Sequence, residues 1–129
     1  MAAAEQLTAA YESADEAMRI SAVFAMGRSM DATWVEPVLT ELLSRNPAMR
    51  GEAARACGEL EVKEAISAVI GLASDADRAV QAAAIEALGQ IGGQRARRVL
   101  ERCCGSEDDA LRAAAVARSV CLHAGGWRG

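Results

Sequence analysis

The feature that most constrains this chain is a repeat of 31 residues. Glycine marks it plainly, because Gly27, Gly58 and Gly89 each lie 31 residues after the one before. Three other columns repeat with the same period. One is basic, with Arg19, Arg50 and Arg112 and with Gln81 in the third place. One is small, with Ala22, Ala53, Ala84 and Ala115, and one has helix-capping residues, with Asp15, Asn46, Asp77 and Asp108. A period of roughly 20 to 50 residues is typical of a solenoid, in which one small supersecondary unit stacks on the next. The repeat therefore predicts a solenoid.

Each unit carries the pattern of two helices. The first helix begins at an Asp or Asn, whose side-chain oxygen can accept a hydrogen bond from the unpaired N–H groups of the first turn. Apolar residues then recur at steps of 3, 4 and 7, as in the column Met18, Met49 and Val80, which is typical of one buried helix face. We expect first helices at Asp15–Arg28, Asn46–Glu59, Asp77–Gln90 and Asp108–Leu122, second helices at Ala32–Ser44, Val62–Ala73 and Gln94–Cys104, and a lone second helix at Ala2–Glu12.

These units form one predicted domain, an all-α solenoid of stacked antiparallel helix pairs. The domain comprises residues 1–122, with a half repeat at 1–13, repeats at 14–44, 45–75 and 76–106, and a partial repeat at 107–122, followed by a Gly-rich tail at 123–129. The repeated glycines fall near the ends of the first helices, where glycine permits either a left-handed turn or a close approach of the next helix. The end helices lack polar caps, which leaves open a homodimer through them, a longer solenoid, or a tail that folds back with Trp127.

Composition narrows the function. Hydrophobic residues make up 52% of the chain but aromatic residues only 3%, which suits closely stacked helices better than a large ligand cavity. The net charge of −4 argues against a dedicated nucleic-acid binder, whose affinity depends on neutralising phosphates. The chain shows no signal-peptide pattern at its start, no apolar run of the roughly 18 residues that a membrane span needs, and no regular cysteine framework. We therefore expect a cytoplasmic protein.

The repeat columns resemble HEAT repeats, specifically the short subtype named after phycobilisome lyases. The best match lies within residues 76–104, where the sequence reads DRAVQAAAIEALGQIGGQRARRVLERC. The resemblance covers about residues 1–122. It implies a right-handed superhelix in which first helices lie outside and second helices line the concave side. It also implies a scaffold for protein contacts, since most members of the family serve in that way, while some act on bilins and some on nucleic acid.

The second helices present the main candidate surface. Residues opposite their apolar stripe are acidic or polar in the first unit (Glu36, Thr40 and Glu41), small in the second (Ser67 and Gly71) and basic in the third (Arg98 and Arg102, beside Arg95). A surface that grades from acidic to basic can steer and orient a partner. The alternative is an ordinary solvated face. Trp34 shares a column with Ala65 and Ala96, so it either fills a gap or anchors a contact.

Two other residue sets suggest sites, and each has a structural alternative. The arginine column could bind phosphates, but one arginine per unit beside a capping residue is more typical of an ion pair or a carbonyl contact with the adjacent unit. Cysteine and histidine suggest zinc (Cys103, Cys104, Cys121 and His123). Cysteines adjacent on a helix diverge by about 100°, however, so burial as small apolar side chains is the favoured interpretation. No catalytic set, cofactor site or metal site is predicted.

The sequence thus favours a non-catalytic scaffold that binds a protein or peptide on its second helices. The alternative is a bilin lyase or a chromophore-associated subunit, as the subtype's name suggests. A third hypothesis is nucleic-acid binding through the basic residues of the last second helix (Arg95, Arg97, Arg98 and Arg102). In that helix Arg97 and Glu101 stand where earlier units are apolar, which indicates a helix open to solvent or facing a partner.

Overall fold

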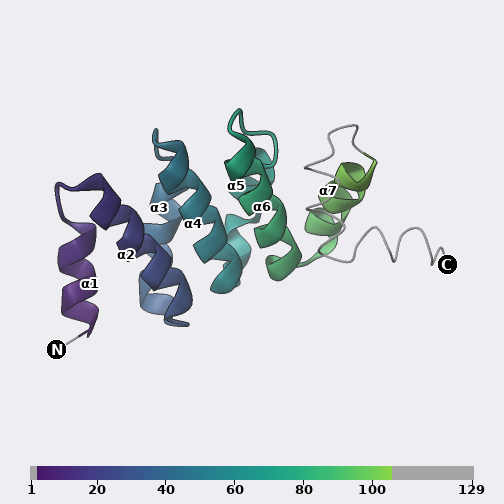
Figure 1. The fold of residues 1–129 in the computed structure, drawn as a ribbon. Helices are drawn as coiled ribbons and strands as arrows, with labels where there is room; N and C mark the ends of the chain where they lie inside the picture. Colours follow the sequence, from purple (N-terminus) through teal and green to yellow (C-terminus); the bar gives the residue numbers. More distant parts are fainter. Residues whose placement is uncertain (1–2, 106–129) are drawn as a thin grey trace.

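The computed structural model describes residues 3–105, and every regular element in this range is helical (Figure 1). The helices are α1 (Ala3–Tyr11), α2 (Glu16–Arg28), α3 (Val35–Glu41), α4 (Pro47–Glu59), α5 (Ile66–Leu72), α6 (Arg78–Ile91) and α7 (Gln94–Cys104), with short 3-10 turns at Ala32–Trp34 and Lys63–Ala65. They stack in two rows, with the first helices α2, α4 and α6 side by side in one row and the second helices in the other (Figure 1). The predicted all-α solenoid is confirmed.

The first helices α2, α4 and α6 begin directly after the capping residues, as the sequence predicts. The side chains of Asp15, Asn46 and Asp77 each accept a hydrogen bond from the N–H group two residues later, at 3.0, 2.9 and 2.9 Å. Pro47 occupies the first helical position of α4. These caps satisfy donors that the helix itself leaves unpaired.

The second helices differ more from the prediction. The segments 32–34 and 63–65 form 3-10 turns, so α3 and α5 begin only at Val35 and Ile66. The third second helix, α7, runs over the whole predicted span. The segment before α7 differs from those before α3 and α5, because it contains Gly92 and Gly93 in place of a 3-10 turn. These glycines have positive φ angles of 76° and 95° and lead the chain directly into α7.

The repeated glycines serve close packing. A Cβ atom on Gly27 would lie 2.7 Å from Cα of Ala56, and one on Gly58 would lie 2.8 Å from Cα of Ala87. Both glycines are buried within helices. The left-handed turns lie instead three residues later, where the chain has positive φ at Met30 (60°), Glu61 (52°) and Gly92 (76°). Of the two uses predicted for this column, close approach is therefore the one that the structure shows.

The core runs along the seam between the two rows of helices. Its largest fully buried side chains include Met26, Met49 and Leu88. Met18 was predicted to share the column of Met49 and Val80, but it is 48% exposed. The reason is its place at the end of the stack, because within residues 3–15 no first helix precedes α2 to cover it.

Candidate functional site

Glu41 corrects the sequence-based prediction of an exposed binding residue. It is only 7% exposed, and one of its carboxylate oxygens accepts hydrogen bonds from the hydroxyl of Tyr11 and from Nη2 of Arg19, the latter at 3.2 Å. Burial, followed by the contact with Glu41, raises the pKa of Tyr11 to about 12. Glu41 thus joins α1, α2 and α3, and it is not open to a partner.

Trp34 is also buried. It is 8% exposed and belongs to the core cluster, as do Ala65 and Ala96 in the same column. Of the two interpretations of this residue, its burial agrees with gap filling and leaves little of the ring open to a partner. The larger ring occupies the core of the first whole unit, where the other units place alanine.

The repeated arginines hold the stack together. Arg50 donates to both carboxylate oxygens of Asp75, at 2.9 and 3.0 Å, and to the carbonyl of Ser44. Arg19 likewise donates to the carbonyl of Tyr11. The carbonyls belong to the preceding unit, as expected, whereas the carboxylates belong to the arginine's own unit. The hydrogen bond from Arg50 is the main cause that lowers the pKa of Asp75.

Seven of the nine predicted binding residues are exposed on the second helices or beside them. We call six of them the second-helix face: Glu36 and Thr40 on α3, Ser67 and Gly71 on α5, and Arg98 and Arg102 on α7. They form two columns of the repeat, Glu36–Ser67–Arg98 and Thr40–Gly71–Arg102. The seventh residue, Arg95, lies beside this face and donates a hydrogen bond to Oγ of Ser67 at 3.0 Å.

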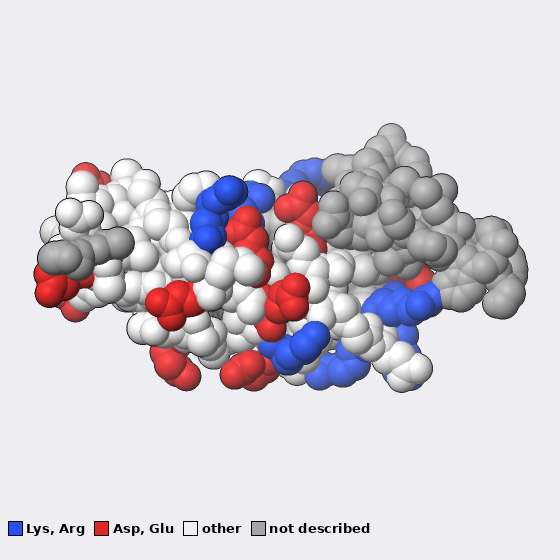
Figure 2. Space-filling view, turned by 90° about the horizontal axis from the view of Figure 1, so that it is seen from below, with Lys and Arg blue, Asp and Glu red and all other residues white. Residues whose placement is uncertain are grey.

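Charge is divided along this row of helices. α7 carries four arginines and one glutamate, whereas α3 carries glutamates and no basic residue. Figure 2 shows this division along its lower edge, with acidic atoms toward the N-terminal side and basic atoms toward α7. Arg97 pairs with Glu101 at 3.3 Å. Within residues 3–105, no hydrogen bond or ion pair engages the guanidinium of Arg98 or Arg102.

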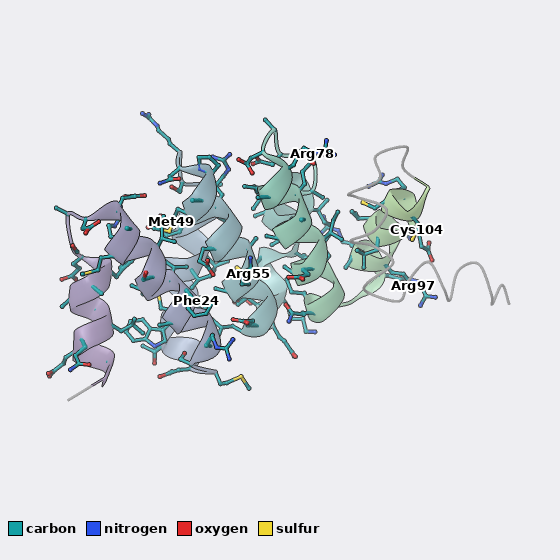
Figure 3. All side chains as sticks on the ribbon, in the orientation of Figure 1. Phe24, Met49, Arg55, Arg78, Arg97 and Cys104 are labelled. Carbon is teal, nitrogen blue, oxygen red and sulfur yellow. The ribbon has the colours of Figure 1, made fainter. Side chains whose placement is uncertain are left out.

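The surface of α7 is hollowed beside these arginines. A groove of about 450 Å³ is lined by Gln94, Arg97, Arg98 and Glu101. Figure 3 shows Arg97 among the side chains at the C-terminal end of the described stack. The lining is polar, with two arginines against one glutamate, so it suits a polar or acidic group better than an apolar ligand.

Sequence reasoning missed a second groove, between α4 and α6. It measures about 330 Å³ and lies where Gly51 stands in the column of Ile20 and Ala82. Glu52 lines it, with one carboxylate oxygen buried and 3.4 Å from Nε of Arg55, and burial raises the pKa of Glu52. Arg55, labelled in Figure 3, also reaches Glu86 on α6 at 3.4 Å. In the sequence, only the glycine at position 51, in a column that otherwise has side chains, could have indicated this groove.

The cysteines show no metal centre in the described chain. Cys57 is buried, which raises its pKa to about 12, and Cys103 is half-buried. Cys104 is disulfide-bonded, which the sequence analysis did not anticipate. Cys121 and His123 lie outside the described residues. Within residues 3–105, no three His, Cys, Asp or Glu side chains gather as metal ligands, and no helix has the length and apolar content to span a membrane.

Comparison with known proteins adds a family and a fold. The family model described as HEAT repeats matches residues 35–121. No curated protein matches the sequence. Among solved structures, the chain resembles the crystal structure of an engineered protein, with a TM-score of 0.63, 22% identity, and coverage of 98% of this chain and 69% of that chain.

A second solved structure has a similar fold. It is the complex of CpcE and CpcF of phycocyanin lyase from Nostoc sp. PCC7120, with a TM-score of 0.63 and 18% identity. The match covers 92% of this chain and 64% of that chain, so this chain spans less than two thirds of its neighbour's length. At these identities the likeness concerns the fold.

Proposed function

This chain belongs to the HEAT-repeat family, and we propose that it is a non-catalytic scaffold that binds a protein or peptide on its second-helix face. HEAT repeats generally mediate protein interactions, which supports the scaffold. The specific face is our proposal, and so is a cytoplasmic location. A stacked array presents equivalent positions of successive helices at regular spacing, so one extended partner can contact α3, α5 and α7 in turn.

The observation that carries this proposal is the pair Arg98 and Arg102. The two lie four residues apart on α7, a spacing that places them on the same side of a helix. Like charges at this spacing destabilise a helix slightly, so the pair contributes nothing favourable to the fold of α7. Both guanidinium groups are exposed, and no described residue neutralises them. Acidic side chains of a partner would supply the missing counter-charge.

The remainder of the face favours a protein partner over nucleic acid. The chain has 18 acidic and 14 basic residues, and on the second helices α3, α5 and α7 the basic residues lie on α7 alone. The N-terminal part of the same row is acidic and would repel a phosphate backbone. A peptide with acidic residues toward one end and neutral or basic residues toward the other would match the whole row.

The test is a peptide-display selection on the wild-type protein, followed by affinity measurements on the selected peptides. We expect enrichment of acidic peptides. Arg98→Glu with Arg102→Glu should raise their dissociation constants at least about tenfold, which corresponds to roughly 1.4 kcal/mol. Binding that is unchanged in this variant would overturn the assignment of the site.

A matched control separates the site from net charge. Arg28→Glu with Arg45→Glu makes the same change in charge on exposed residues outside α7. This control variant should retain peptide affinity, and the melting temperatures of both variants should stay close to that of the wild type. Equal weakening in both variants would show a non-specific charge effect.

The second proposal is a bilin lyase or a chromophore-associated subunit. The similar fold of a phycocyanin lyase complex supports it, although the likeness at 18% identity extends to the fold alone. A bilin added to the protein should then change its absorption spectrum on binding. A spectrum equal to the sum of the two components would remove this proposal and leave the scaffold intact.

A further inference from the structure

We propose that a second copy of this chain occupies the second-helix face, in a two-fold dimer that places α3 of each copy against α7 of the other. The inference rests on the proposed binding role of this face, and it names one partner. The repeat register, the charge at its two ends and the small residues at its centre carry the argument.

The register places opposite charges at equivalent heights. Glu36 and Arg98 are 62 residues apart, which is two repeats, so they occupy the same position on α3 and on α7. Ser67 holds that position on α5, between them. A two-fold axis along α5 in the plane of the face exchanges α3 with α7 and preserves height along the helices. Glu36 of each copy then faces Arg98 of the other, and the contact occurs twice because the interface is isologous.

The middle of the face permits close approach. Gly71 is exposed, and a Cβ atom built on it would meet nothing within 4 Å. Ser67, one turn earlier on α5, is also small and exposed. Two copies of α5 can therefore meet at Gly71 without long side chains between them, while Arg95 of α7 reaches over Ser67 through its hydrogen bond to Oγ. The close approach at Gly71 brings the charged side chains of the flanking helices within reach of each other.

An apolar contact accompanies the charge pairs. Leu43 is 81% exposed and follows Thr40 at the end of α3. The symmetry places it level with Gly105 of the other copy, beside the stem of that copy's Arg102. Burial of an exposed leucine supplies the non-directional part of the binding energy, whereas exposed ion pairs supply mainly orientation.

The charges of the two ends balance. Residues 30–42 and 61–73 are the repeat equivalents of residues 92–104, which contain α7. Their exposed charges are Asp31, Glu36, Glu61 and Glu64 against Lys63, a sum of −3, and α7 has four arginines against Glu101, a sum of +3. The same symmetry sets the two copies of Glu64 level with each other, and Arg95 of each copy supplies an opposite charge at that height on α7. An antiparallel pair is thus nearly neutral across its interface, whereas a parallel pair would place like charges together.

The test is a charge exchange read by sedimentation velocity on the full chain. The wild type should dimerise at roughly 100 µM. Glu36→Arg alone and Arg98→Glu alone should each weaken the dimer at least about tenfold, because each change breaks both symmetric pairs. An equimolar mixture of the two variants should restore dimers, since the arginine introduced in one chain then faces the glutamate introduced in the other.

Net charge cannot explain such restoration. Glu36→Arg changes the net charge from −4 to −2, and Arg98→Glu changes it to −6, so both chains remain negative and repel at long range. As a control, Arg45→Glu keeps both charges of the face and should dimerise as the wild type does, whereas mixing it with Glu36→Arg should add no dimer beyond that of Arg45→Glu alone. A monomeric wild type, a dimer that resists both single variants, or a mixture that fails to pair would each overturn the inference.

The outcomes also separate this inference from the proposed function. A monomeric chain whose selected peptides lose affinity on Arg98→Glu with Arg102→Glu would retain the scaffold and reject the dimer. A dimer that persists in both single variants would point to the end helices. Restored pairing in a chain that binds no peptide would retain the dimer and reject the wider scaffold.

Discussion

The first helices and the second helices derive from the same repeat, yet they meet their neighbours in different ways. α2, α4 and α6 approach so closely that Gly27 and Gly58 leave no room for a Cβ atom. The second helices lie farther apart, and Gly71 on α5 faces open space. One row therefore holds the stack together, and the other row is free to vary its surface. Glycines show this difference directly, because Gly27 and Gly58 are tightly packed and Gly71 is not.

This difference explains where charge is placed. In the first-helix row, Arg55 pairs with Glu86 of the next unit, and Arg50 is satisfied by Asp75 and the carbonyl of Ser44. In the second-helix row, Arg98 and Arg102 have no such partners within the described chain. Charges that support the fold are paired within the described chain, and the pair Arg98 and Arg102 forms part of the binding surface that we propose.

The largest expected effect comes from Gly58→Ala. Its new Cβ atom would lie 2.8 Å from Cα of Ala87, a backbone atom that cannot move without shifting α6. We expect the free energy of unfolding to fall by about 2 kcal/mol, because the overpacking outweighs the gain in helix propensity. Urea denaturation followed by circular dichroism measures this. An unchanged midpoint would contradict close packing as the role of the glycine column.

An intermediate effect is expected at Asp75, which links the two rows through Arg50. Arg50 lowers the pKa of Asp75 below its ordinary value of 3.8. The ion pair therefore adds stability above that value, and this stability is lost as the pH falls through the lowered pKa. In Asp75→Asn the component is absent, so the stability difference between wild type and variant should shrink toward low pH. Urea titrations between neutral and acidic pH would show it, and a difference independent of pH would refute the link.

The smallest effect comes from Gly71→Ala, which makes the same chemical change on the open row. Alanine loses less backbone entropy than glycine on forming a helix, and the structure offers no clash at this position. The free energy of unfolding should rise by about 0.5 to 1 kcal/mol. A loss of stability, measured at a protein concentration below any self-association, would mean that the two rows are packed alike.

Most of the architecture could be predicted from the sequence, because it depends on local rules that repeat. The period identified the units, and capping residues identified the starts of α2, α4 and α6. Exposure was harder to predict, because it depends on what lies beside a residue. Glu41 was expected on the surface, yet Arg19 and Tyr11 from two other helices cover it. Met18 was expected in the core, yet within the described chain no first helix precedes it.

The candidate site was predicted in part for the same reason. The repeat register placed Glu36, Ser67 and Arg98 in one column, and the structure leaves all three exposed. The register could not show that Trp34 would turn inward, since its column is occupied by alanine in the other units. The groove beside Gly51 was missed because a single glycine outside the repeated column carried its only signal.

The most direct test of the central claim is a footprint of a bound peptide on the amide NMR spectrum of the protein. Perturbed resonances and slowed hydrogen exchange should cluster on α3, α5 and α7, with the largest changes around Arg98 and Arg102. The resonances of α2 and α4 should stay near their free positions. A footprint on α2, α4 and α6, or one confined to the groove between α4 and α6, would contradict the assignment of the second helices as the binding surface.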